Sequence, residues 1–150
     1  MTKQFGINSL GQQLKLINIL TEKELKAGLQ NLTPKLTGTQ VAVLMYLNDN
    51  RTIVVTQKQI EMTLQLSHPT TRGIIKRLVA TGLINTSTAH NDRRQVVLTL
   101  SAAGQQFLQY HIDLIEDQLS TVENKLIFGI EPEALQTFRN VLVIMLKNMQ

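Results

Sequence analysis

The sequence lacks cysteine and tryptophan altogether, and aromatic residues make up only 4% of it. Without cysteine, the chain can form no disulfide bond, no thiolate metal site and no thiol redox switch. With so few aromatic side chains, we do not expect a platform on which the bases of a single-stranded nucleic acid stack. These absences exclude thiol-dependent functions and disfavour single-strand binding.

Long apolar segments and catalytic motifs are also missing. The longest aliphatic run, residues 141–146, is far too short to span a bilayer, and no N-terminal apolar segment with a cleavage site is visible. The sequence contains neither a nucleophile elbow nor a glycine-rich phosphate-binding loop. We therefore expect a cytoplasmic protein without a membrane partner, and we predict that it is not an enzyme and has no catalytic residues.

The three histidines do not indicate a metal site. Zinc sites on helices typically use two histidines four residues apart, and His68, His90 and His111 offer no such pair. The acidic residues that follow His111 lie on the polar side of a predicted helix, where a run of charge is usually solvated. We predict neither a metal ligand nor a cofactor.

The charge of the chain is concentrated in its middle third. The net charge of +4 divides into +2 for residues 1–50, +5 for residues 51–100 and −3 for residues 101–150. A basic centre between less basic ends is typical of a protein that binds nucleic acid. With 150 residues and 43% hydrophobic content, the chain is large enough for one domain with an apolar core.

Residues 67–81 lie in this basic segment and are predicted to form a helix. Ser67 is a suitable N-cap, and Pro69 falls in the first turn, where its missing N–H costs little. Gly82 provides a stop signal. One side of the helix is apolar and is expected to be buried; it consists of Ile75, Leu78 and Val79, with Thr71 one turn earlier.

The opposite side of this helix is small and basic. Along it lie Pro69, Gly73, Lys76 and Ala80, flanked by Thr70, Arg72 and Arg77. Small residues allow a backbone to approach a surface closely, and the flanking cations suit a polyanion. The pattern therefore favours a helix that lies in the major groove of DNA. A surface helix that merely happens to be basic is the alternative.

Two short helical segments precede this helix. A mostly buried helix is expected over residues 41–47, after Thr33-Pro34 has broken the preceding helical pattern. The β-branched residues 53–55 predict a very short strand. Thr56 and Gln59 have the spacing of a capping box and open the next helix, only a few residues before Ser67. Two helices joined by a tight turn predict a helix-turn-helix.

A β-hairpin is predicted directly after Gly82. Residues 83–88 and 95–100 have the composition of strands, and residues 90–94 form a polar, basic tip between them. A hairpin in this place is a wing, and an arginine at its tip could enter a neighbouring minor groove.

The two ends of the chain predict long amphipathic helices. Apolar residues recur at helical spacing over residues 10–32, step by 4, 3, 4, 3, 4 from Leu108 to Leu126, and repeat this pattern over residues 135–149 after Gly129. One small lobe cannot cover so much apolar surface. We therefore expect a homodimer, and closed two-fold pairs are the commonest oligomers. Packing of the terminal helices on each other within one chain is the alternative.

Four sequence motifs occur in a characteristic order and spacing. They are Leu66-Ser67-His68-Pro69-Thr70-Thr71 running on to Lys76-Arg77-Leu78, then Gly82-Leu83-Ile84, Asp92-Arg93-Arg94 and Leu100-Ser101-Ala102-Ala103-Gly104. With them the chain resembles, over essentially its whole length, the MarR family of bacterial winged helix-turn-helix transcription regulators. The resemblance implies a mainly α fold with a small β-hairpin wing, in a single MarR-type domain over residues 1–150. A winged helix-turn-helix lobe would span about residues 36–100, and dimerisation helices about residues 8–32 and 101–149.

The resemblance also implies a function. Members of the family are homodimers that bind a pseudo-palindromic duplex, more often as repressors than as activators, and many are released by a small aromatic effector bound between the dimer helices and the DNA-binding lobe. By the same resemblance, Arg94 enters the minor groove and Asp92 orients this arginine without contacting DNA itself. We predict a sequence-specific, double-stranded DNA-binding transcription regulator. The alternative is a winged-helix adaptor that binds a protein and not DNA, although an adaptor has no reason to keep a +5 middle segment.

Site residues follow from these predictions. DNA contacts are predicted for Arg51, Lys58, Ser67, His68, Pro69, Thr70, Thr71, Arg72, Lys76, Arg77, Arg93 and Arg94. Dimerisation is predicted for Leu10, Leu14, Ile17, Leu119, Val122, Leu135, Phe138, Leu142 and Met145. Tyr46, Tyr110 and His111 are candidates for an effector pocket, although each is also explained as an ordinary residue at the edge of the core. Whether His68 contacts a base or only the DNA backbone stays open.

Overall fold

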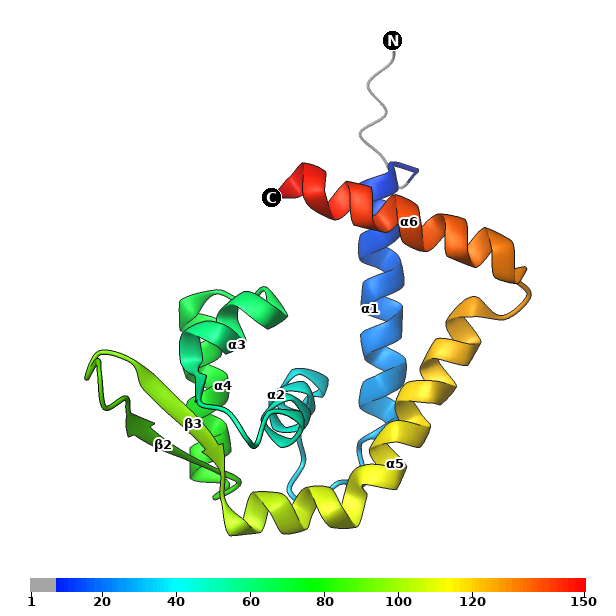
Figure 1. Cartoon of the computed structure of the whole chain (residues 1–150). Coiled ribbons are helices and arrows are strands. Elements are labelled where there is room, and N and C mark those ends of the chain that lie inside the picture. The colour runs from blue at the N-terminus through cyan, green and yellow to red at the C-terminus, as the bar shows by residue number, and fades with distance from the viewer. Residues whose placement is uncertain (1–7) are drawn as a thin grey trace.

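Six helices and three short strands make up residues 8–150, which are the residues that the computed structural model describes (Figure 1). In chain order they are α1 (Leu10–Gly28), α2 (Gly38–Asp49), β1 (Val55–Thr56), α3 (Gln57–Leu64), α4 (His68–Ala80), β2 (Ile84–Thr88), β3 (Val96–Leu100), α5 (Ala102–Ile127) and α6 (Pro132–Met149). The predicted fold class, mainly α with a small β-hairpin wing, is confirmed.

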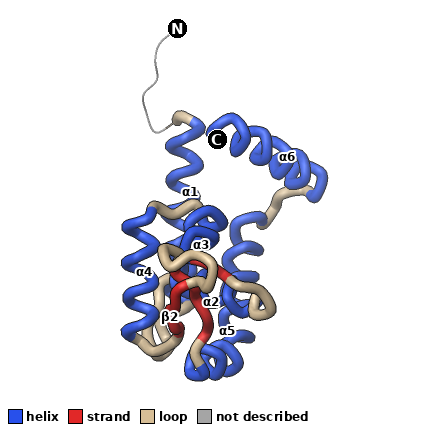
Figure 2. Tube along the Cα trace, turned by 60° about the vertical axis from the view of Figure 1, so that its left-hand side comes forward, coloured by secondary structure: helices blue, strands red, loops and turns tan. Residues whose placement is uncertain are grey.

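The elements from α2 to β3 form the winged helix-turn-helix lobe. Its three strands make one antiparallel sheet in the order β1-β3-β2, visible beside α4 in Figure 2. β2 and β3 form the hairpin, with Ile84 opposite Leu100, and β1 pairs with the other side of β3. The helices α2, α3 and α4 each contribute a fully buried side chain to one apolar core, namely Leu44, Ile60 and Leu78. This core holds the helix-turn-helix and the wing in a fixed arrangement.

Reciprocal side-chain caps determine where α2 and α3 begin. Thr37 Oγ1 accepts the Gln40 N–H at 3.2 Å, and Gln40 Oε1 accepts the Thr37 N–H at 2.8 Å. Thr56 and Gln59 make the same pair at the start of α3, at 3.3 and 2.7 Å, which confirms the predicted capping box. Each box satisfies amides that the first turn of a helix leaves without a partner.

The helices α1, α5 and α6 extend to one side of the lobe (Figure 1). Near its lobe end, α1 packs against α5, where Lys125 Nζ lies 2.9 Å from Glu24 Oε1. α6 returns from the end of α5 towards the N-terminal end of α1, and Arg139 Nη2 on it donates to Glu123 Oε1 on α5 at 3.1 Å. α6 contains no buried residue.

Within residues 8–150, no helix combines the length and the apolar character needed to cross a membrane.

Two predicted segments are wrong at their ends. α1 stops at Gly28 and not at residue 32; Leu29 and Leu32 continue the apolar pattern because they are buried in the core of the lobe, each 1% exposed. The short strand is confined to Val55–Thr56, the two residues that pair with β3, and the preceding Ile53 and Val54 are exposed.

The buried side of α4 is also rotated relative to the prediction. Val79 is 42% exposed, whereas Ile74, which was not assigned to the apolar side, is 9% exposed. The buried side therefore consists of Thr71, Ile74, Ile75 and Leu78. Val79 lies on the C-terminal edge of this side, just before the chain leaves the helix.

Candidate nucleic-acid interface

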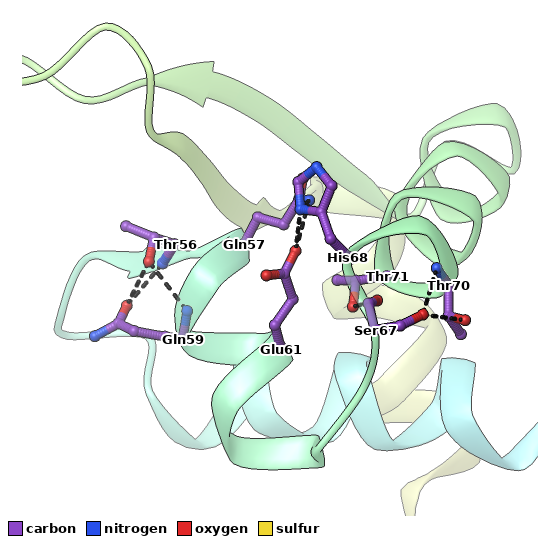
Figure 3. Close-up of polar contacts among 8 residues, drawn as sticks. All are labelled: Thr56, Gln57, Gln59, Glu61, Ser67, His68, Thr70 and Thr71. Carbon is purple, nitrogen blue, oxygen red and sulfur yellow. Dashed lines mark hydrogen bonds and ion pairs between the residues drawn. The ribbon is translucent and has the colours of Figure 1, made fainter.

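The first turn of α4 is organised by hydroxyl groups (Figure 3). Ser67 Oγ accepts the Thr70 N–H at 3.3 Å and donates to Thr70 Oγ1 at 2.8 Å. Thr71 Oγ1 donates to the Ser67 carbonyl at 3.0 Å, and Thr71 is fully buried. Thr71 was predicted to contact DNA, and this burial contradicts the prediction because the residue has no exposed surface and its hydroxyl is bonded to the Ser67 carbonyl. Ser67 and Thr70 are exposed.

The remainder of the predicted recognition face is exposed, small and basic. Its exposed residues are His68, Pro69, Thr70, Arg72, Gly73, Lys76, Arg77 and Ala80. A Cβ added at Gly73 would have no atom of another residue within 4 Å, so the backbone of α4 is open to close approach there. A narrow strip of accessible backbone between cations suits the floor and the phosphate walls of a major groove.

The C-terminal end of α4 is a Schellman turn. The Leu83 N–H donates to the Leu78 carbonyl at 3.1 Å, and the Gly82 N–H donates to the Val79 carbonyl at 2.9 Å. Gly82 has a φ of +76°, a conformation that residues with a Cβ rarely adopt. The predicted stop signal is therefore confirmed.

Ser101 and Gly104 join this turn to α5. The Ser101 N–H donates to the Leu83 carbonyl at 3.0 Å, and the Ser101 hydroxyl donates to the Gly82 carbonyl while it accepts the Gly104 N–H at 2.9 Å. A Cβ on Gly104 would overlap the Leu83 carbonyl oxygen. The serine and glycine of the motif that ends at Gly104 thus hold the end of α4 against the first turn of α5.

The wing presents two exposed arginines from a tight turn. Asp92 Oδ1 accepts the Arg94 N–H at 2.9 Å, and the Asp92 carbonyl accepts the Gln95 N–H at 3.0 Å. Asp92 therefore positions the backbone of Arg94, and no ion pair joins it to the guanidinium of Arg93 or Arg94 in the described part of the chain. Arg93 and Arg94 are both exposed.

A hydrogen-bonded cluster connects α3 to α4 (Figure 3). Glu61 Oε1 lies 2.6 Å from His68 Nδ1 and accepts from Gln57 Nε2 at 2.9 Å. The hydrogen bond from Gln57 is the main reason that the pKa of Glu61 lies below its usual 4.5; burial opposes this effect, and the hydrogen bond and charge of His68 and the charge of Lys58 add to the lowering. Gln57 and Glu61 were not among the predicted site residues. Their spacing of four on one helix was visible in the sequence, but their contact with His68 crosses the turn and has no sequence signature.

The other two predicted cations occupy different places. Lys58 lines a pocket of about 240 Å³ between α3, the start of α4 and the wing, together with His68 and Arg94. Arg51 follows α2, donates through Nε to the Asn48 carbonyl at 3.1 Å, and lines a separate pocket beside α5. The structure thus gathers Lys58, His68 and Arg94 and leaves Arg51 apart from them.

The three effector candidates do not converge on one pocket. Tyr46 is half-buried on α2 against the core, and Tyr110 on α5 is 84% exposed. The rings of Tyr110 and His111 meet edge to face, with centroids 4.8 Å apart. A pocket of about 640 Å³ lies elsewhere, between α1, the start of α2 and the turn before α4. It is lined by Glu22, Leu25, Lys26, Lys35, Leu36, Thr37, Gly38, Thr39, Ala42, Leu64 and Leu66.

None of the nine residues predicted to form the dimer interface is buried within the chain. Leu10, Ile17, Leu119 and Phe138 are 43–52% exposed, and the other five are half-buried. The heptad pattern of α5 divides into two parts, because Leu108 and Ile115 belong to the core of the lobe whereas Leu119 and Leu126 are exposed.

Between residues 8 and 150, no group of three or more His, Asp or Glu side chains is placed to hold a metal ion.

Comparison with protein families identifies the lobe. A model of the MarR family matches residues 35–95, which run from the segment before α2 to the end of the wing turn. No curated protein matches the sequence.

Solved structures match almost the whole chain. S. aureus MepR in complex with DNA is 19% identical, with a TM-score of 0.80 over 95% of this chain and 97% of that one. A mutant of E. coli MarR in complex with operator DNA is 20% identical, with a TM-score of 0.75 over 93% and 95%. Bordetella bronchiseptica BpsR, whose DNA binding is regulated by 6-hydroxynicotinic acid, is 23% identical, with a TM-score of 0.72 over 95% and 94%. At these identities the likeness establishes a common fold.

Proposed function

Because a model of the MarR family matches the lobe of this chain, we propose that the chain belongs to this family of transcription regulators, binds a specific double-stranded DNA sequence as a homodimer and represses transcription until a small molecule releases it. Members of this family are regulators and not enzymes, in agreement with the prediction from the sequence. The observation that supports DNA binding most directly is the exposed face of α4, small along its centre and basic at its edges, next to the exposed arginines of the wing.

In the proposed complex, α4 lies in the major groove and the wing reaches the adjacent minor groove. Arg72, Lys76 and Arg77 on α4 and Lys58 on α3 neutralise phosphates, and Thr70 and Lys76 are closest to base edges. Arg94 enters the minor groove, where the negative potential is concentrated. Two copies of α4 would sit about 34–36 Å apart, one turn of the duplex, and would read the halves of a pseudo-palindrome.

The test of DNA binding is selection of duplexes from fragmented genomic DNA, followed by affinity measurements on the selected duplex at two salt concentrations. We expect a shared pseudo-palindromic sequence. If each protomer contacts several phosphates, an increase in salt from 50 to 200 mM should weaken binding by about 10³-fold or more. Weak binding that neither selects a sequence nor depends steeply on salt would contradict the proposal and favour a protein-binding adaptor.

The proposed homodimer rests on apolar side chains that one copy of the chain leaves uncovered. On α1, the end of α5, the loop that follows it and α6 these are Leu10, Leu16, Ile17, Ile19, Leu20, Leu119, Leu126, Phe128, Ile130, Phe138, Val141, Val143, Ile144, Leu146 and Met149. So large a set of exposed apolar residues on neighbouring helices is unusual for a monomer. A second copy that brings the same set to a two-fold axis would bury them.

The proposed effector site is the pocket of about 640 Å³ beside α1. Leu25, Leu36 and Leu64 give it apolar walls, while Lys26 and Lys35 supply positive charge opposite Glu22. Such a lining suits a small aromatic carboxylate, whose ring is apolar and whose acid group is anionic. The pocket joins the dimer helices to the lobe, so a ligand there would favour one relative orientation of the two.

The effector proposal is tested with 6-hydroxynicotinic acid and benzoate as probes. We expect one of them to weaken binding to the selected duplex, and we expect Lys26→Gln to reduce this response while DNA binding without the probe stays unchanged. Lys23→Gln, on an exposed part of the same helix, is the matched control. An unchanged response in Lys26→Gln would contradict the assignment of this pocket.

A further inference from the structure

The cluster of Gln57, Glu61 and His68 holds an exposed imidazole at the start of the recognition helix (Figure 3). The Glu61 side chain is 18% exposed and the His68 side chain is 62% exposed. Gln57 is buried at the base of the cluster. Two sheltered residues of α3 thus fix the orientation of one accessible ring on α4.

The charge of Glu61 determines which ring nitrogen carries a proton. The lowered pKa of Glu61 keeps it ionised at neutral pH, so its carboxylate can only accept hydrogen bonds. At 2.6 Å from Glu61 Oε1, His68 Nδ1 must therefore be the donor. Gln57 Nε2 also lies 3.3 Å from Nδ1, but it donates to Glu61 instead, at 2.9 Å. Nε2 is then the ring nitrogen that is left for a partner outside the protein.

The charged groups around the ring favour an anion as that partner. Glu61 and Lys58 approach from α3, and Arg94 approaches from the wing, since all of them line one pocket with His68. On α4 itself, Arg72 follows one turn later and is exposed. Glu61 is the single carboxylate in this group, and its charge is directed at Nδ1. A phosphate that entered between α4 and the wing would meet Nε2 among cations.

We propose that Glu61 is a positioning residue that presents Nε2 of His68 to a phosphate of the DNA backbone, and that uptake of one proton at Nε2 strengthens this contact. The inference rests on the proposed function, because it requires a duplex at α4. A neutral ring offers the phosphate a lone pair, whereas a protonated ring offers an N–H donor and a positive charge. The proton comes from solvent and stays on the ring, while Glu61 remains ionised and balances its charge.

DNA affinity should therefore rise as the pH falls. Binding that takes up one proton per protomer changes the association constant by at most about tenfold per pH unit. We expect the affinity of the wild-type dimer for its selected duplex to fall by about tenfold per protomer when the pH is raised from about 6 to about 8. The measurement is fluorescence anisotropy at constant ionic strength.

Two variants test the role of His68 and the role of Glu61 separately. His68→Gln keeps a hydrogen-bonding side chain that does not titrate, so its affinity should be constant over this range. Glu61→Gln removes the charge that favours a protonated ring, so the fall in affinity should move to lower pH. Asp49→Asn, at the exposed end of α2, is the matched control for Glu61→Gln and should follow the wild type. Nitrogen-15 NMR of the wild-type complex should show a proton on both nitrogens of the His68 ring at the pH at which the affinity is highest.

Several results would overturn the inference. They are a wild-type affinity that does not change with pH, a His68→Gln variant that keeps the pH dependence, or a Glu61→Gln variant whose profile is not displaced. In each case the duplex is still bound with a steep salt dependence, so the proposed function stands and only the role of the cluster fails. If no duplex is bound at any pH, the proposed function fails and this inference fails with it.

Discussion

Gly104, in the first turn of α5, lies against the backbone of the turn that follows α4. A Cβ at this position would overlap the Leu83 carbonyl oxygen, and it would also lie 3.3 Å from Leu100 Cδ2. The obstacle is backbone, which cannot move without disturbing the hydrogen bond from the Ser101 N–H to the same carbonyl. The close approach of α5 to the turn after α4 therefore requires a residue without a Cβ.

Gly104→Ala should destabilise the fold by about 2–3 kcal/mol, the magnitude found when a methyl group is forced into a closely packed site. The measurement is urea unfolding followed by circular dichroism. Gly73→Ala is the matched control, since a Cβ there meets nothing within 4 Å. It should instead stabilise the protein by about 0.5–1 kcal/mol, because alanine is the better helix former. Equal effects of the two substitutions would contradict the packing argument.

Which residues form local contacts could be predicted from the sequence, and which form contacts across a turn could not. Thr56 and Gln59 are three residues apart on one helix, so helix geometry alone brings them together. The contact between Glu61 and His68 depends on the path of the chain between α3 and α4. No spacing rule fixes that path, and the cluster was therefore missed.

Among the elements, α4 shows how far periodicity can be used. Its length, its N-cap and its stop signal were predicted, but the buried side was placed too far towards Val79 and omitted Ile74. Both residues are β-branched and apolar, so composition does not distinguish them. Only the packing of the lobe distinguishes them, because Ile74 and Leu78 belong to its core whereas Val79 is exposed.

The exposed side of α4 gives a prediction about groove fit. Gly73→Leu should leave the fold intact, because nothing within 4 Å obstructs the position, but it should weaken binding to the selected duplex by at least about tenfold by keeping the backbone away from the bases. Gly11→Leu on α1, at a glycine equally free of neighbours, is the control and should bind normally. Normal DNA binding by Gly73→Leu would mean that a different face of the lobe meets DNA.

The wing gives a second prediction at this scale. Arg94→Ala should weaken DNA binding by about 1–3 kcal/mol and reduce its salt dependence, while the oligomeric state stays the same. Asp92→Ala should have a smaller effect in the same direction, because it removes only the hydrogen bond to the Arg94 N–H. Lys23→Ala on α1 serves as a control for the loss of one positive charge. An unaltered affinity in Arg94→Ala would exclude the wing from the interface.

For the whole molecule, the lobe was predicted well and the arrangement of the outer helices less well. In the sequence, the apolar heptad positions of α5 form one continuous pattern. In the structure, Leu108 and Ile115 are buried in the lobe, whereas Leu119 and Leu126 are exposed. A helical repeat shows that a side is apolar, but it does not show whether the same chain or another covers it. That distinction requires the fold.

Phe138→Glu should convert the proposed dimer into monomers, because it places a charge among apolar side chains that only a second copy can cover. Sedimentation velocity measures the change, and DNA affinity should fall with it, since one protomer reaches only half of the site. Val54→Glu introduces the same charge at an exposed apolar residue outside the outer helices and should remain dimeric. A monomeric wild-type protein would contradict the proposal outright.

The hydrogen bonds among Gly82, Leu83 and Ser101 leave no flexible linker between the recognition helix and α5. We therefore expect α4 and the first turn of α5 to move together, with the rest of α5 extending towards the proposed two-fold axis. A tilt of α5 too small to disturb its own packing would then be magnified at α4. In the proposed dimer, the distance between the two copies of α4 would depend on an angle near the two-fold axis, and a ligand that changed this angle would change the distance.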